Sequence, residues 1–128
     1  TILEAAGARY PAEYAGRAIQ PIEGESFAAL LRGGARSREA PICWEHEGNR
    51  AVRRGPWKLV RRYPGPWELY HLERDRTELD DLSERYPGLV KELAAAYYDW
   101  AARCGVLEWE RVIELRKRRS GEPASAPA

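Results

Sequence analysis

The side chains best suited to chemistry in this 128-residue chain gather in residues 45–50, Glu-His-Glu-Gly-Asn-Arg. This segment places an imidazole, two carboxylates, an amide and a guanidinium around a turn. We predict that His46, Asn49 and Arg50 contact a substrate, because loops often carry binding residues and histidine changes charge near neutral pH. The alternative is a polar hairpin in which Arg50 pairs with Glu45 or Glu47 and the histidine is structural.

Neither cysteine stands in a setting for metal binding or nucleophilic catalysis. Cys43 and Cys104 lie far apart in the sequence, without a CxxC pair or a second His or Cys at metal-ligand spacing. We therefore predict no catalytic residue and no metal site in this chain. The thiols are expected to be free and buried, with a Cys43–Cys104 disulfide as the alternative.

The charge balance argues against nucleic acid and membranes as partners. Lys and Arg number 21 against 20 Asp and Glu, so the net charge of +1 supplies no attractive field. No apolar run approaches the roughly 20 residues of a membrane span, and no signal peptide is recognisable. We expect a soluble chain, and the sequence leaves its compartment, cytoplasmic or periplasmic, open. Five cationic residues alternate with aromatic residues in the predicted strands: Arg53, Arg54, Lys58, Arg61 and Arg62. We interpret this pattern as a solvated sheet face rather than a nucleic-acid-binding surface.

The elements that would position residues 45–50 follow from periodicity. Residues 41–72 alternate with period two between turn signals at 48–49, 55–56 and 63–66, which predicts a four-stranded antiparallel sheet. Three tryptophans, Trp44, Trp57 and Trp67, fall one per strand and are expected to bury one sheet face. Before the sheet we expect the end of a helix stopped by Gly7, a loop over residues 8–20 and a short helix over 26–31.

A long helix is predicted after the sheet. Pro87 suits a first helical position and Gly105 a helix end. Thr77 and Asp80 have capping-box spacing ahead of a short helical turn. A second helix over 107–119 has no evident packing partner. The fold class is therefore α+β, a small sheet packed by a C-terminal helix through one apolar stripe: Leu89, Val90, Leu93, Tyr97, Trp100, Ala101 and Cys104.

Several linked motifs carry a resemblance to a known family. Residues 49–60 read Asn-Arg-Ala-Val-Arg-Arg-Gly-Pro-Trp-Lys-Leu-Val, residues 67–72 Trp-Glu-Leu-Tyr-His-Leu, and residues 75–79 Asp-Arg-Thr-Glu-Leu. In order and spacing they closely resemble the C-terminal signature of arylsulfatases. The likeness covers about residues 1–109, and residues 1–11 look like the closing helix of the large sulfatase domain. The chain departs from the signature at His71, where Asp is usual, at Arg76, where Pro is usual, and at Asp81, where Asn is usual.

The resemblance implies a catalytic apparatus that this chain does not carry. Sulfatases share the alkaline phosphatase-like fold, in which a large domain holds Ca²⁺ and a formylglycine made within a Cys/Ser-x-Pro/Ala-x-Arg motif. Neither Cys43 nor Cys104 begins such a motif. We therefore predict no cofactor in this chain and no activity of the isolated chain. Its expected partners are a missing N-terminal catalytic domain and, in the intact enzyme, a sulfate ester.

The resulting interpretation assigns residues 1–40 to a remnant of the large domain and a connecting loop, residues 41–119 to the C-terminal sulfatase subdomain, and residues 120–128 to a disordered tail. The subdomain completes the fold of a sulfuric ester hydrolase and shapes its substrate cleft. Two alternatives stay open. One is a stand-alone binding module derived from a sulfatase, and the other is the same subdomain of a phosphonate or phosphate monoester hydrolase.

Overall fold

A computed structural model describes residues 1–36, 38 and 40–120, and the chain divides into two compact units, Thr1–Arg38 and Glu39–Ala128. Residues 121–128 of the predicted tail lie outside the described residues, while Ser120 ends a helix. The first unit contains four short elements: α1 (Ile2–Ala5), β1 (Glu13–Tyr14), β2 (Arg17–Ala18) and α2 (Ala28–Leu31).

The first unit differs from the sequence prediction in two places. Strands β1 and β2 form a hairpin where a loop was expected, because Ala15 and Gly16 both adopt positive φ, 49° and 74°, as a two-residue hairpin turn requires. Helix α2 begins at Ala28 rather than at Ser26. The Ser26 hydroxyl instead bonds Glu4 and accepts the Ala28 N–H, so Ser26 lies before the helix.

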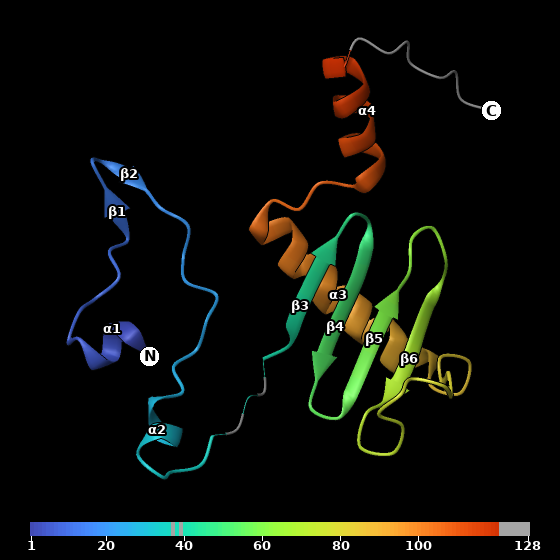
Figure 1. Ribbon diagram of the computed structural model, residues 1–128, viewed down its shortest axis with the longest axis horizontal. Helices are drawn as coiled ribbons and strands as arrows, with labels where there is room; N and C mark the ends of the chain where they lie inside the picture. Colours follow the sequence, from blue (N-terminus) through green and yellow to red (C-terminus); the bar gives the residue numbers. More distant parts are fainter. Residues whose placement is uncertain (37, 39, 121–128) are drawn as a thin grey trace. The chain divides into compact units, whose positions relative to one another are not determined.

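The second unit contains the predicted antiparallel sheet, in the strand order β3-β4-β5-β6 (Figure 1). The turn between β3 and β4 lies at Glu47 and Gly48, one residue before the expected position, and both residues have positive φ, 52° and 83°. The strands are β3 (Ile42–His46), β4 (Asn49–Arg54), β5 (Trp57–Arg61) and β6 (Trp67–His71).

Helix α3 (Pro87–Cys104) covers one face of this sheet and lies behind it in Figure 1. Pro87 begins the helix, and Gly105 ends it in the left-handed conformation with φ 69°, as predicted. Leu93, Tyr97 and Ala101, spaced four residues apart, are its buried residues. They pack against a row of buried strand residues, Val52, Leu59 and Leu69. The α+β arrangement of a sheet packed by a C-terminal helix is thus confirmed.

One predicted core tryptophan lies on the opposite sheet face. Trp57 and Trp67 pack against the core, whereas Trp44 is 46% exposed. The register pairs Cys43 with Val52, which places Cys43 on the α3 side. Because side chains alternate along a strand, Trp44 points away from α3.

The segment between β6 and α3 also corrects the sequence prediction. The Asp75 carboxylate accepts the N–H groups of Leu79 and Asp80, so no capping box forms between Thr77 and Asp80. The following turn is capped by Asp81, which accepts the Ser83 N–H and also that of Leu69 in β6. These hydrogen bonds hold the segment against the sheet edge.

Candidate functional site

The tip of the β3–β4 hairpin carries two of the three predicted substrate-binding residues. His46 and Asn49 form the last register pair before the turn, and both are exposed. The Asn49 amide donates to the His46 carbonyl oxygen over 2.9 Å and accepts the Tyr63 N–H over 3.1 Å. Asn49 therefore fastens the tip to the turn after β5.

Gly48 is the point at which helix α4 (Trp109–Ser120) meets the hairpin. A Cβ at position 48 would lie 2.9 Å from Trp109 Cβ and 2.9 Å from Tyr63 Cγ. Only glycine therefore satisfies both the close approach and the left-handed backbone. The packing partner of α4, which the sequence left open, is thus the hairpin tip.

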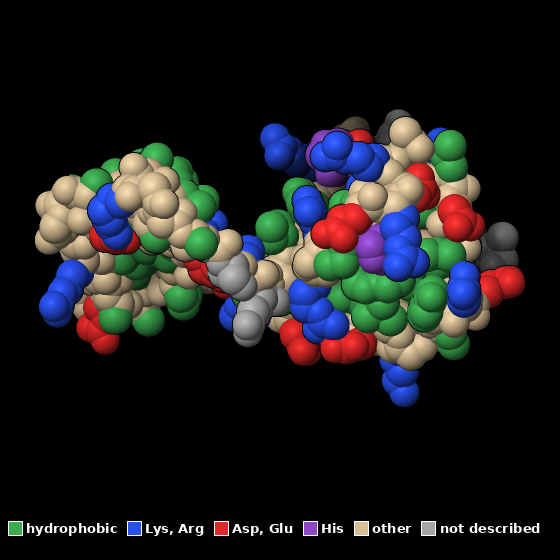
Figure 2. Space-filling model, turned by 90° about the horizontal axis from the view of Figure 1, so that it is seen from below, with side chains coloured by type: hydrophobic (Ala, Val, Ile, Leu, Met, Phe, Trp, Pro, Cys, Tyr) green, Lys and Arg blue, Asp and Glu red, His purple; other side chains and the backbone are tan. Residues whose placement is uncertain are grey.

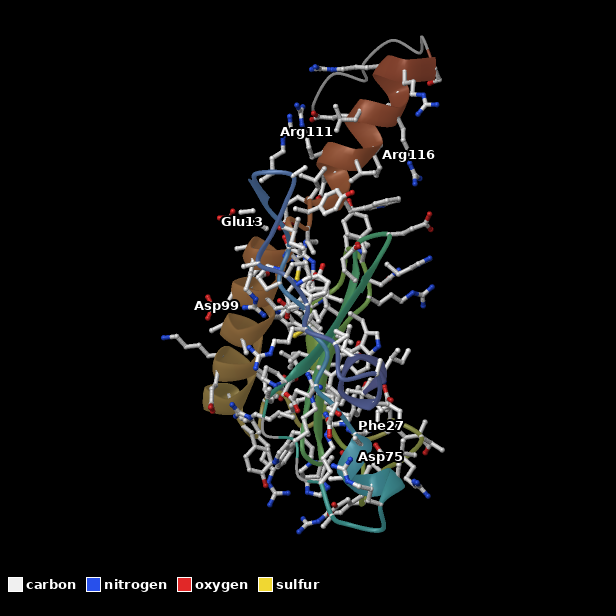
Figure 3. The ribbon with its side chains drawn as sticks, turned by 90° about the vertical axis from the view of Figure 1, so that its left-hand side faces the viewer. Glu13, Phe27, Asp75, Asp99, Arg111 and Arg116 are labelled. Atoms are coloured by element: carbon white, nitrogen blue, oxygen red, sulfur yellow. The ribbon has the colours of Figure 1, made fainter. Side chains whose placement is uncertain are left out.

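Charged contacts extend this junction along α4. The Arg116 guanidinium lies 4.9 Å from the centre of the Trp109 ring and 3.8 Å from the Glu47 carboxylate. Arg111 leaves the helix on another side and pairs with Glu114 (Figure 3). The contacts of Arg116 therefore bind α4 to the turn that presents His46.

Arg50 lies on the other side of the sheet. Arg50 is only 8% exposed, and its guanidinium carbon lies 5.6 Å from the ring centre of Tyr97 and 5.7 Å from that of Tyr98. The guanidinium also donates a hydrogen bond to the Tyr98 hydroxyl. Its ion-pair partner is Glu108. Burial lowers the pKa of Arg50, but the hydrogen bond and charge of Glu108 outweigh burial, so the pKa rises above its ordinary value. Arg50 therefore stays charged beneath the aromatic rings.

The alternative pairing of Arg50 with Glu45 or Glu47 is not seen among the described residues. Glu45 accepts the Gly48 N–H over 2.8 Å and so closes the turn, while Glu47 contacts Arg116. Instead Arg50 reaches Glu108, the last residue before α4. The structure therefore brings His46 and Asn49 together at the turn, and all three residues line one groove, although the Arg50 guanidinium is engaged by Tyr98 and Glu108.

A shallow groove of about 320 Å³ follows the sheet face away from α3. It runs from His46 and Asn49 past Trp44 to Val60, and Arg50, Arg62 and Glu68 also line it. Figure 2 shows side chains of both charge signs scattered over the visible surface of the second unit. The groove thus presents an aromatic ring and an imidazole to solvent.

A second crevice, of about 220 Å³, was not anticipated from the sequence. Trp57 and His71 meet edge to face in it, with ring centres 4.7 Å apart, and Asp80 and Arg85 also line it. The buried His71 Nδ1 has no hydrogen-bond partner among the described residues. The departure from the arylsulfatase signature at position 71 was the sequence signal that could have marked this crevice.

Cys43 and Cys104 form no disulfide with each other in the described part of the chain, and both are half-buried rather than buried as predicted. Within residues 1–36, 38 and 40–120, no group of three or more His, Cys, Asp or Glu side chains is placed to hold a metal ion. No helix in the described part of the chain is long and apolar enough to cross a membrane.

Comparisons with known proteins yield sequence relatives and structural neighbours. No family model matches the chain. An uncharacterized sulfatase of Schizosaccharomyces pombe is 34% identical over 68 residues, which are 50% of this chain and 12% of that protein. The chain thus spans about an eighth of the length of this curated relative.

Two crystal structures share the fold. One is a Bacteroides thetaiotaomicron protein labelled BT33336S-sulf, which is described with the metabolism of multiple glycosaminoglycans. The match covers 79% of this chain and 23% of that protein chain, with a TM-score of 0.63 and 19% sequence identity. Ps i-CgsB, also known in complex with k-i-k-neocarrahexaose, matches 76% of this chain and 23% of its own, with a TM-score of 0.54 and 20% identity. The sequence match and the shared fold confirm the resemblance drawn from the motifs: this chain is similar to part of a sulfatase.

Proposed function

We propose that this chain is the C-terminal subdomain of an arylsulfatase-type sulfuric ester hydrolase, which completes the fold and does not catalyse alone. The observation that carries the proposal is the surface of the first unit. Among its described residues only Ala28 is buried, while Ile2, Tyr14 and Leu31 are each largely exposed. Figure 2 likewise shows hydrophobic side chains open on this unit. Such a surface requires a further partner to bury it.

The exposed surface of the first unit also supports an assignment of the two units to different parts of the enzyme. Residues 1–40 belong to the large domain and its connection, and residues 41–119 form the subdomain. The first unit has too few buried side chains to be stable alone, whereas the second has a core of its own around Leu59 and Leu93. The same contrast disfavours a stand-alone binding module, because a module would carry the unfinished first unit without any benefit to its stability.

Within the subdomain, we assign substrate contact to the β3–β4 tip. His46 lies exposed there, on a turn fixed by Gly48 and Asn49. A rigid tip can present an imidazole to the organic part of a sulfate ester at the mouth of the catalytic domain. Asn49 and Arg50 then serve by holding the tip, since both side chains are engaged by neighbouring groups.

The chemistry of bond cleavage belongs to the missing domain. The resemblance implies Ca²⁺ and a formylglycine, but the described residues hold no group of three acidic, His or Cys side chains that could bind a cation. They do not fit the metal, and no catalytic step passes through this chain. Sulfate esters of glycans are a suitable substrate class to test, given what the two structural neighbours are described with.

The test begins with the coding sequence upstream of Thr1. A Cys/Ser-x-Pro/Ala-x-Arg motif in frame supports the proposal, whereas a start codon immediately before Thr1 contradicts it. The intact polypeptide should then hydrolyse 4-nitrophenyl sulfate faster than the corresponding phenyl phosphonate, and the opposite preference would favour the phosphonate hydrolase. Purified 128-residue chain should turn over neither, and chelator-sensitive turnover by it would refute the proposal.

The contribution of His46 is tested in the same intact polypeptide. We expect His46→Ala to raise KM for a sulfated saccharide while leaving the unfolding midpoint unchanged, because the side chain is exposed. Glu84→Ala is the matched control at another exposed position of the second unit. Unchanged KM in the His46 variant would remove this residue from the substrate site.

A further inference from the structure

A buried ring nitrogen without a partner marks the crevice beside β6. The Nδ1 atom of His71 is enclosed, and no described residue forms a hydrogen bond with it. Leaving such an atom unpaired is unfavourable, so its position requires an explanation. His71 pairs with Trp57 in the register of β5 and β6, and both residues line the crevice of about 220 Å³. The unpaired nitrogen therefore lies in a residue that a bound molecule can reach.

This crevice is separate from the groove at the β3–β4 tip. Strand β4 runs from Asn49 at the tip to Arg54, which pairs with Trp57, so the crevice lies at the far end of the sheet. Trp57 packs against the core beneath α3, whereas Trp44 of the groove lies on the opposite face. In Figure 1 the segment after the edge strand β6 leads to the start of α3. A ligand in the crevice would touch neither His46 nor the face away from α3.

The rim of the crevice carries two arginines on a fixed backbone. The Arg74 N–H donates to the His71 carbonyl oxygen over 2.9 Å, and the Arg85 N–H donates to that of Leu82 over 3.1 Å. Both arginine side chains are exposed, and neither forms an ion pair with a described residue. The Arg85 guanidinium lies 5.5 Å from the ring centre of Tyr86. Two guanidinium groups are thus available, and their preferred partner is a carboxylate.

The other lining residues set the size and charge of a ligand. The Asp75 carboxylate is already engaged by two backbone N–H groups, while the Asp80 carboxylate has no partner among the described residues. Among the charged groups without a partner, two are therefore cationic and one is anionic, which favours a ligand with a single negative charge. Half-buried Trp57, Leu82 and Tyr86 supply an apolar wall for its body.

We propose that this crevice binds a small organic acid that carries one carboxylate and a hydroxyl group at its other end. The carboxylate binds the guanidinium groups of Arg74 and Arg85 at the rim, and the apolar body packs against Trp57. The hydroxyl group donates to the buried Nδ1 of His71, which gives this atom the partner that it lacks. The site is independent of the proposed function, because it requires neither a catalytic domain nor turnover.

An NMR titration of the 128-residue chain with 4-hydroxybenzoate tests the proposal, followed through the indole N–H signal of Trp57. We expect a Kd on the order of 1 mM, as is usual for so small a ligand. Two analogues should each bind about tenfold more weakly, benzoate because it lacks the hydroxyl group and 4-hydroxybenzamide because it lacks the charge. No binding of 4-hydroxybenzoate would overturn the site. Equal binding of inorganic sulfate would overturn the ligand class, because sulfate has no apolar body.

Variants assign the binding to these residues. Arg85→Gln should weaken the binding of 4-hydroxybenzoate about tenfold, whereas Arg118→Gln, at an exposed position of α4, should leave it unchanged. His71→Phe keeps a ring opposite Trp57 and removes the unpaired nitrogen, so it should weaken binding without lowering the Tm of the free chain. A lower Tm with unchanged affinity would make His71 structural and contradict the proposal. If the His71 variant does not fold, the exposed Arg85 decides, and unchanged affinity in Arg85→Gln refutes the site.

Discussion

Replacing Arg50 should destabilise the second unit far more than replacing a surface arginine. Arg50 is 8% exposed, and Arg50→Ala removes two ring contacts, the hydrogen bond to Tyr98 and the ion pair with Glu108. Cation–π contacts contribute about 0.5–2 kcal/mol each and a charged hydrogen bond about 1.5–3 kcal/mol. Because Glu108 is 65% exposed and can return to water, we expect the free energy of unfolding to fall by about 3 kcal/mol rather than by the full sum.

Arg54→Ala is the matched control for this prediction. Arg54 pairs with Glu92 on the surface, with both side chains at least one-third exposed, so its loss should cost less than about 1 kcal/mol. Urea titration of the 128-residue chain, followed by far-UV circular dichroism and extrapolated linearly, measures both values. If the two variants lie within about 0.5 kcal/mol of each other, burial of the guanidinium does not set its contribution, and our reasoning about the aromatic pocket is wrong.

Three further predictions follow from the turns and from the thiols. Gly48→Ala should lower the free energy of unfolding, measured by chemical denaturation, by about 2–3 kcal/mol, because φ is 83° and the new Cβ would contact Trp109. Gly55→Ala is the control and should cost about 1 kcal/mol, because φ is 57° but nothing lies within 4 Å of the new Cβ. Equal costs would contradict the packing of α4 on the hairpin. The hydrogen bond from the Asp80 N–H lowers the pKa of Asp75. The Asp75 carboxylate therefore stabilises the fold at pH values above the ordinary aspartate pKa of about 3.9, and this stabilisation is lost as pH falls through the lower folded pKa. The urea midpoints of wild type and Asp75→Asn should accordingly differ at pH 6 and converge near pH 2. Mass spectrometry under non-reducing conditions should find free thiols at both cysteines, and a disulfide would contradict the structure.

Much of the fold was predictable because its signals are local. Alternation and turn residues gave four strands, and Pro87 and Gly105 marked both ends of α3. The hairpin in the first unit was missed because its strands are two residues long, too short for any period to register. The Asp75 turn was missed because Thr77 and Asp80 have the spacing of a cap, while Asp75 competes for the same N–H groups.

The candidate site was predictable only in part. Residues 45–50 concentrate polar side chains, and the structure exposes His46, Glu47 and Asn49 at the turn but buries Arg50. Sequence could not show that Asn49 binds the backbone of Tyr63, because that contact depends on the twist of the neighbouring strands. Nor could it choose a partner for Arg50 among 20 acidic residues, since a guanidinium accepts any carboxylate that the fold brings near.

By itself, the sequence determined the type and order of the main elements and the likeness to the arylsulfatase C-terminal signature, because hydrophobic period, caps and motif spacing are written in neighbouring residues. Only the tertiary structure decided which sheet face each side chain joins, where α4 packs, and that Arg50 reaches Glu108, 58 positions away. Strand register and helix placement settle these points. Both are fixed by contacts between distant segments, where a shift of one residue moves Trp44 from the solvent-facing side of the sheet to the core.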